Sequence, residues 1–289
     1  MRHPGRAAAR LTLRVMLLGV AVIALAAAPS ASARPYKMIW GPVTLPNGAS
    51  AFPTYHKLGV RVLQIDLKWY EAAPTQPANP QDPSDPAYQW PAELDQAVTA
   101  AGRYHIRLCL LVDGTPPWAN GSLSPANIVI GGNTWSFGQV EPADFVRWMK
   151  LPDGKPPPLD YYGHNPFGRR FPNLKQKPYF PGGRDLNDID TLEAQLRGIY
   201  HRRVKLWLSE YTISSNHPTD AFDFSVSRKA QARWLTAAFK LVNSVNYVAG
   251  LGWFNLIDDA PHQSENLTNG LLTWRLKPKP AFYAYEHAR

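Results

Sequence analysis

Seven short apolar runs, separated by polar and helix-forming stretches, constrain the fold of this chain more than any other feature. They begin near residues 38, 61, 106, 127, 160, 205 and 249. Between several of them, apolar residues recur at helical spacing, most clearly over residues 92–104 and 227–245. Near-continuous apolar strands that alternate with helices predict a parallel sheet covered by helices.

Two architectures have such a sheet, the (β/α)₈ barrel and the open doubly wound fold. The doubly wound fold is disfavoured because no Gly-rich phosphate-binding turn follows the first run. Barrel enzymes build their sites where the strands end, and polar or aromatic residues follow nearly every run. We therefore predict an α/β fold of the TIM-type (β/α)₈ class. The strand-end residues are Asp66, Trp69, Asp113, Trp118, Asn133, His164, Glu210, Tyr211, Trp253 and Asn255.

The predicted barrel is one strand short. The link between the runs at residues 106 and 127 is DGTPPWANGSLSPA, which is rich in Pro and Gly and has no helical pattern. A parallel crossover needs about a dozen or more residues and usually a helix, and a βα unit of a barrel averages about 30 residues. We expect that strand four and its flanking helices are absent, so that the barrel is incomplete.

The first 33 residues have the pattern of a secretory signal peptide. Four arginines precede an apolar run over residues 15–28, and Ala31-Ser32-Ala33 supplies a cleavage site near Ala33. An uncleaved membrane anchor is the alternative. We expect residues 34–289 to form the barrel domain and to be secreted, either to the periplasm or to the extracellular medium, with no membrane contact after cleavage.

Charge and cysteine content exclude several other classes of function. The formal charge of +9 becomes 9 − 4 = +5 once the four leader arginines are removed, and the remaining basic residues are mostly scattered. Nucleic-acid binding therefore has little support. Cys109 is the single cysteine, so no intrachain disulfide can form. No zinc-type or nucleotide-type spacing implies a metal or a cofactor, and nothing indicates an oligomeric state.

Glu210 is the most unusual residue of the apolar runs. In VKLWLSEY (204–211), strict alternation puts Glu210 on the same face as Leu206 and Leu208, and Tyr211 on the opposite face. A carboxylate that ends an apolar strand is costly to bury unless it is paired or takes part in chemistry. The alternative is an ordinary surface glutamate at a strand end.

An ordered set of motifs resembles a known family. VRVLQIDLKW, IRLCLLVDGTPPWANG, NIVIGGNTW, YYGHNPF, VKLWLSEYT and GLGWFNLIDD together resemble the retaining (β/α)₈ glycosidases of the cellulase (family 5) and β-xylosidase (family 39) clan. The resemblance spans roughly residues 36–287. It implies an O-glycosyl hydrolase that acts on a polysaccharide or oligosaccharide, with Glu210 as the nucleophile.

The chain departs from this family at the second catalytic position. The family's general acid/base is a Glu that follows an Asn at the end of strand four, and residues 118–127 contain no such pair. Retaining hydrolysis uses two carboxyl groups about 5–5.5 Å apart, so we expect impaired activity unless Asp113, Asp258 or Asp259 substitutes. The alternatives are a non-catalytic carbohydrate-binding barrel and a truncated inactive homologue.

Seven further residues are expected to bind substrate, and most have a structural alternative. His164 has a satisfied loop histidine as its alternative, and Trp253 is either a sugar-stacking platform or a core residue. Tyr211 is expected to orient Glu210, and Trp69 and Trp118 to form subsite walls. The full set is Asp66, Trp69, Trp118, His164, Asn165, Tyr211 and Trp253.

Overall fold

A computed structural model describes residues 34–289 apart from 115, 117, 120–129, 137–139, 220, 262 and 264. The strands are β1 (Tyr36–Trp40), β2 (Val62–Lys68), β3 (Arg107–Asp113), β4 (Ile130–Trp135), β5 (Tyr161–Asn165), β6 (Lys205–Tyr211), β7 (Ser214–Ser215), β8 (Ser225–Val226) and β9 (Val248–Trp253). The helices are α1 (Phe52–Lys57), α2 (Trp69–Ala72), α3 (Ala92–Tyr104), α4 (Pro142–Trp148), α5 (Ile189–Tyr200), α6 (Arg228–Asn243) and α7 (Pro280–His287). None of the described helices is long and apolar enough to cross a membrane.

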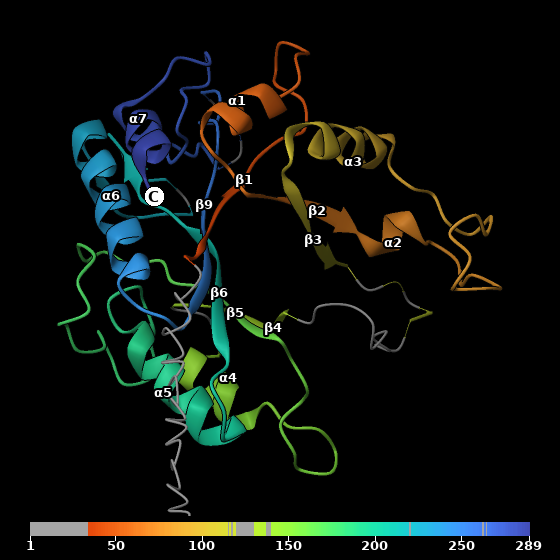
Figure 1. The fold of residues 1–289 in the computed structure, drawn as a ribbon, viewed down its shortest axis with the longest axis horizontal. Coiled ribbons are helices and arrows are strands. Elements are labelled where there is room, and N and C mark those ends of the chain that lie inside the picture. Colours follow the sequence, from red (N-terminus) through yellow and green to blue (C-terminus); the bar gives the residue numbers. More distant parts are fainter. Residues whose placement is uncertain are drawn as a thin grey trace, which may run out of the picture. The chain divides into compact units, whose positions relative to one another are not determined.

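Seven of the strands form one parallel sheet in the order β3-β2-β1-β9-β6-β5-β4, shown in Figure 1. The pairing of β1 with β9 joins the first and last large strands, as a barrel requires. The two edges are β3 and β4, which follow one another in the sequence. In the described residues the sheet is therefore a half-barrel of the TIM type, and its two edge strands flank the interval at which the sequence predicts a missing unit.

Strand β4 continues further than predicted. Most of the expected strand over 127–130 lies outside the described residues, and the described strand covers Ile130–Trp135. Gly132 and Asn133 adopt left-handed φ values of 93° and 40°, which shift the register between Gly131 and Thr134. Glycine tolerates this backbone without strain, so the strand continues through Gly132.

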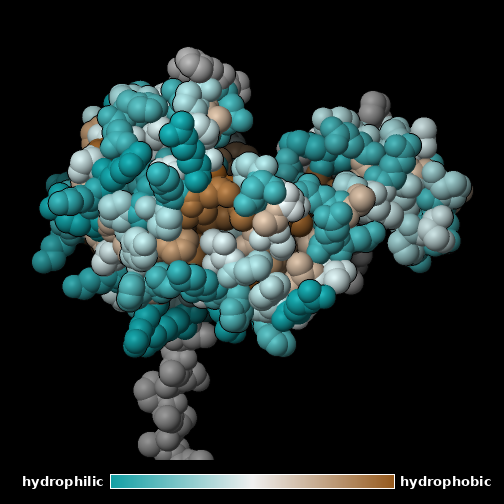
Figure 2. All heavy atoms as spheres, turned by 90° about the horizontal axis from the view of Figure 1, so that it is seen from above, coloured by the Kyte–Doolittle hydropathy of each residue, from teal (hydrophilic) through white to brown (hydrophobic). Residues whose placement is uncertain are grey.

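The two faces of the sheet are packed differently. On the helix-covered face, Ile39, Leu63 and Leu208 are fully buried in the main core. On the opposite, inner face, a smaller cluster includes Met38 and Trp207. On the surface seen in Figure 2, hydrophilic residues predominate and apolar surface gathers in one central hollow.

A β-bulge at the end of β6 determines which face of the sheet Glu210 and Tyr211 occupy. Leu208 lies opposite Leu251 of β9, and Tyr211 lies opposite Trp253, so β6 has one extra residue in this interval. Tyr211 therefore shares the helix-covered face with Leu208, and Glu210 turns to the inner face. The alternation-based assignment of both residues is wrong, because simple alternation does not account for the extra residue.

Gly252 makes the close approach at the bulge possible. A Cβ atom at this position would lie 2.0 Å from the backbone oxygen of Ser209, and real Cβ atoms do not come so near. The bulge in β6 therefore requires a glycine at position 252 of the neighbouring strand β9.

Candidate active site

Glu210 lies at the carboxyl end of β6, and Trp40 of β1 lies beside its carboxylate. Burial raises the pKa of Glu210 to about 7, and the indole N–H of Trp40 acts in the opposite direction as a donor. Nε1 of Trp40 is buried and has no fully formed hydrogen bond. A desolvated carboxylate at a strand end, with a polar N–H directed toward it, is an arrangement typical of functional sites.

A cleft of about 280 Å³ lies at the ends of β1 and β2. Trp40 forms part of its lining, together with Asp66, Leu67 and the start of α3 at Pro91 and Glu93. The cleft therefore connects the neighbour of Glu210 with one of the predicted substrate-binding residues.

The raised pKa of Glu210 makes a prediction about stability. Its folded value of about 7 exceeds the ordinary value of 4.5, so between these pH values the unfolded chain releases a proton that the folded chain retains. The free energy of unfolding therefore falls as the pH rises through this window. Glu210→Gln should be more stable than the parent at pH 8 by up to about 3 kcal/mol, and the two should converge near pH 4. Urea unfolding at both pH values tests this, and a difference independent of pH would contradict it.

The described residues supply no second carboxylate to Glu210. No other acidic group contributes to the shift of its pKa. Asp258 accepts hydrogen bonds from Lys279 Nζ at 2.8 and 3.1 Å, and Asp259 accepts the Leu267 N–H at 2.8 Å. Both candidate substitutes are thus engaged in holding loops. The third, Asp113, ends β3, and its side chain lies outside the described part of the structure.

Asn165 lies on the inner side of the sheet next to the bulge. Ser209 Oγ donates a hydrogen bond of 2.6 Å to its Oδ1 and lies 3.3 Å from Oδ1 of Asn133. These contacts bring the ends of β4, β5 and β6 together immediately before Glu210. Asn165 is largely buried, so the contact fixes the strand ends beneath the candidate nucleophile.

His164 is a histidine whose hydrogen bonds are all made within the protein, which was the alternative to its predicted role in substrate binding. It is completely buried, with Nδ1 2.9 Å from Thr134 Oγ1 and Nε2 2.8 Å from the Arg184 carbonyl oxygen. Burial lowers its pKa to about 4, so the ring is neutral and both nitrogens are satisfied. The ring has no nitrogen left for Glu210 or for a sugar, and it instead links β4, β5 and the loop before α5.

Trp253 and Tyr211 belong to the core rather than to a sugar platform. Each is only 1% exposed, and their rings make an edge-to-face contact with centroids 6.1 Å apart. Trp253 also donates its indole N–H to the Asn269 carbonyl oxygen at 3.0 Å. The substrate-binding prediction for both residues is wrong, because the bulge and the strand register turn them toward the helices.

The remaining predicted residues stay accessible at the ends of β2 and β3. Trp69 and Trp118 make an edge-to-face contact at 5.7 Å, and Trp118 Nε1 donates to the Ala73 carbonyl oxygen at 2.8 Å. Asp66 is exposed and pairs with Lys68 at 2.7 Å. The two tryptophans thus form a partly exposed aromatic pair, and their role as subsite walls stays a prediction.

A second aromatic pair was not predicted from the sequence. Tyr88 and Trp90 stack with ring centroids 4.9 Å apart, in the loop between α2 and α3. The Tyr88 hydroxyl donates to the Pro80 carbonyl oxygen and Trp90 Nε1 to that of Pro83, which holds the rings in place. The loop has only turn chemistry, so the sequence carried no signal for this pair beyond the residues themselves.

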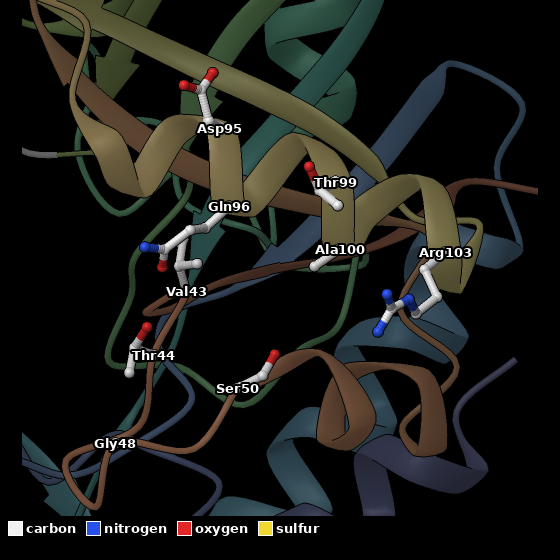
Figure 3. Close-up of a pocket in the computed structure, with 9 residues that line it drawn as sticks. All are labelled: Val43, Thr44, Gly48, Ser50, Asp95, Gln96, Thr99, Ala100 and Arg103. Carbon is white, nitrogen blue, oxygen red and sulfur yellow. The ribbon is translucent and has the colours of Figure 1, made fainter.

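A larger cavity of about 500 Å³ lies away from the candidate residues. Figure 3 shows Gln96 and Arg103 extending from α3 toward the loop that carries Thr44 and Ser50. It contains none of the predicted site residues. In the described residues, no group of three or more His, Cys, Asp or Glu side chains could hold a metal ion.

No protein-family profile and no curated protein matches the sequence. Solved structures do match, and they are glycoside hydrolases with the (β/α)₈ fold. The chain therefore has the fold of this class of protein, in half-barrel form.

Three of these structures show the extent of the likeness. A family 39 glycoside hydrolase from Bacteroides cellulosilyticus WH2 matches with a TM-score of 0.56 at 14% identity, over 89% of this chain and 64% of its own. A glucosidase from Croceicoccus marinus gives 0.57 at 14% identity, over 88% and 65%. GH5_18 from Streptomyces cattleya, in complex with GlcNAc, gives 0.52 at 14% identity, over 88% and 80%. The chain thus spans less than two thirds of the first two proteins.

Proposed function

We propose that the protein is an exported glycoside hydrolase that cleaves O-glycosidic bonds of a polysaccharide or oligosaccharide by a retaining mechanism, with Glu210 as its nucleophile. The observation that carries the proposal is the desolvated carboxylate of Glu210, turned by the β6 bulge onto the inner face of a glycosidase-type sheet. The leader pattern of residues 1–33 supports export.

In a retaining mechanism, Glu210 would be one of the two carboxyl groups that take part, the nucleophile. Its ionised carboxylate attacks the anomeric carbon, and the sugar–oxygen bond to the leaving group breaks. A second carboxyl group would protonate the leaving oxygen and later deprotonate the attacking water, which is worth about 10²–10⁴-fold. Because the described residues place no such group at Glu210, we propose that activity on ordinary sugars is impaired.

The lack of a general acid/base among the described residues allows a specific kinetic test of the proposal. A dinitrophenyl leaving group departs without a proton, and azide attacks the glycosyl-enzyme without a general base. We therefore expect turnover of dinitrophenyl glycosides, acceleration by azide of at least about tenfold, and a β-glycosyl azide product from a β-glycoside. Methyl glycosides should react at least about 10²-fold more slowly. Absence of turnover on a panel of dinitrophenyl glycosides would refute the proposal.

A non-catalytic carbohydrate-binding protein is the second candidate. It is favoured by the same lack of a second described carboxylate and by the anchored Trp69–Trp118 pair. This candidate predicts polysaccharide binding that survives Glu210→Gln, with no turnover by the parent. A truncated inactive homologue would instead lack a cooperative unfolding transition.

A further inference from the structure

A pocket of about 290 Å³ shares no lining residue with the cleft at Trp40. It is lined by residues of the segment after β6, residues of the segment after β9, and Arg228 at the start of α6. β6 and β9 pair in parallel, so both segments leave the end of the sheet at which Glu210 lies. In barrel folds the loops at this end of the strands bind substrate.

Three cationic side chains line this pocket, and none of them has an ion-pair partner among the described residues. They are Arg228, Arg275 and Lys277, and all three are exposed. Two carboxylates also line the pocket, but Asp258 is paired with Lys279 at 2.8 Å, which leaves only Asp259 to oppose the three cations. The pocket therefore has an excess of positive charge.

The turn that carries two of these cations is held by its own hydrogen bonds. The Thr273 N–H donates to the Lys277 carbonyl oxygen at 2.9 Å, and the Lys277 N–H donates to Thr273 Oγ1 at 3.1 Å. Within the turn, the Arg275 guanidinium lies over the Trp274 ring, 4.3 Å from its centroid. Groups that are already ordered lose little conformational entropy when they bind a ligand.

The buried part of the lining is tied to the Lys279 ion pair. Lys279 Nζ donates to Asp258 at 2.8 Å and to the Thr268 carbonyl oxygen at 2.9 Å. The Ser215 N–H donates to the same carbonyl oxygen at 3.1 Å. These bonds join the segment after β6 to the segment after β9, so the pocket is formed before any ligand binds.

The lining combines three kinds of group that together fit an acidic sugar. Cations bind a carboxylate or a sulfate through charge-assisted hydrogen bonds. Trp274 is 40% exposed and lines the pocket, so it offers an aromatic surface against which a pyranose ring packs. Asn216, Asn266 and Thr273 add amide and hydroxyl groups that match sugar hydroxyls. An inorganic anion would need neither the aromatic ring nor the amides.

From this lining we propose that the pocket binds an anionic sugar residue, one that bears a carboxylate or a sulfate group, of an acidic polysaccharide or oligosaccharide. The cations contact the acidic group, and Trp274 supports the ring. The inference rests on the proposed function in taking carbohydrate as the ligand, and it adds an acidic class of substrate to that function. It does not depend on the chemistry at Glu210.

Calorimetric titration of the Glu210→Gln chain tests the binding without hydrolysis. The probes are oligogalacturonate, oligoglucuronate and sulfated dextran oligosaccharide, each compared with its neutral counterpart and with inorganic sulfate. We expect at least one acidic probe to bind at least about tenfold more tightly than its neutral counterpart and than sulfate, because charge-assisted hydrogen bonds are added to the sugar contacts. Absence of binding by every acidic probe, or equal binding of the neutral counterparts or of sulfate, would overturn the proposal.

Two double variants of the same chain separate the pocket from general attraction to polyanions. Arg275→Gln with Lys277→Gln removes two pocket cations and should raise the Kd of the acidic probe at least about tenfold. The matched control, Lys57→Gln with Arg61→Gln, removes the same charge from exposed positions shortly before β2, at the other end of the strands. It should change the Kd less than about threefold in 0.15 M salt.

Thermal unfolding shows whether both variants remain folded, and an equal loss of binding in the two folded variants would refute the site. Turnover of dinitrophenyl glycosides is measured separately on the parent chain. Failure of the proposed catalysis and failure of this binding site are therefore distinguished.

Discussion

Glu210→Gln is expected to lower kcat/KM for dinitrophenyl glycosides by at least about 10⁴-fold, since loss of a nucleophile is among the most damaging single changes in an enzyme. Glutamine has the same size and can still accept a hydrogen bond from Trp40, but its neutral amide attacks an anomeric carbon poorly. Its folding should be intact, because it removes a desolvated charge rather than a packed group.

The matched control for this variant is Glu265→Gln, at an exposed loop glutamate. It makes the same chemical change at a residue outside the candidate site and should leave kcat/KM within about twofold. Initial rates with a single dinitrophenyl substrate compare the two variants. Retention of more than a tenth of the parent rate by Glu210→Gln would remove Glu210 from the chemistry.

Lys279→Met is expected to cause the largest loss of stability, about 3–5 kcal/mol. The Lys279 side chain is fully buried, and its Nζ donates to both oxygens of Asp258 and to the Thr268 carbonyl oxygen at 2.9 Å. Its removal leaves the Asp258 carboxylate buried without the cation that is hydrogen-bonded to it. Urea unfolding measures the effect. The pair ties the segment after β9 to the start of α7, so the loss should also loosen loops at the open ends of the strands.

Two further variants separate this charge effect from lost packing. Lys277→Met changes an exposed lysine two residues away and should stay within about 0.5 kcal/mol of the parent. Lys279→Met combined with Asp258→Asn removes both charges and should recover part of the loss, because no unpaired ion remains. A Lys279→Met cost below about 1 kcal/mol would contradict the account.

The architecture could be predicted from the sequence because the burial of a whole strand requires a run of apolar residues. Seven apolar runs predicted the seven parallel strands that the described residues form. The missing unit that the Pro-rich link between the runs at residues 106 and 127 indicates stays a prediction, because most of that link lies outside the described residues. These signals are local and repeated, so an error in one strand boundary, as at β4, did not change the topology.

The directions of individual side chains at the site could not be predicted from the sequence, because they depend on tertiary contacts. The bulge in β6 requires Gly252 of β9 against Ser209, and no pattern within β6 itself reveals it. That one extra residue moves Glu210 to the inner face and Tyr211 into the core. His164 depends likewise on Thr134 and on a distant loop carbonyl for both of its hydrogen bonds.

Covalent trapping of Glu210 tests the central claim most directly. A 2-deoxy-2-fluoro glycoside with a dinitrophenyl leaving group slows hydrolysis of the glycosyl-enzyme, so the intermediate accumulates on the nucleophile. The intact mass should rise by one fluorosugar, and peptide mass spectrometry should locate it on Glu210, with no label on Glu210→Gln. Label on another residue, or no label from any sugar of a panel, would contradict the account.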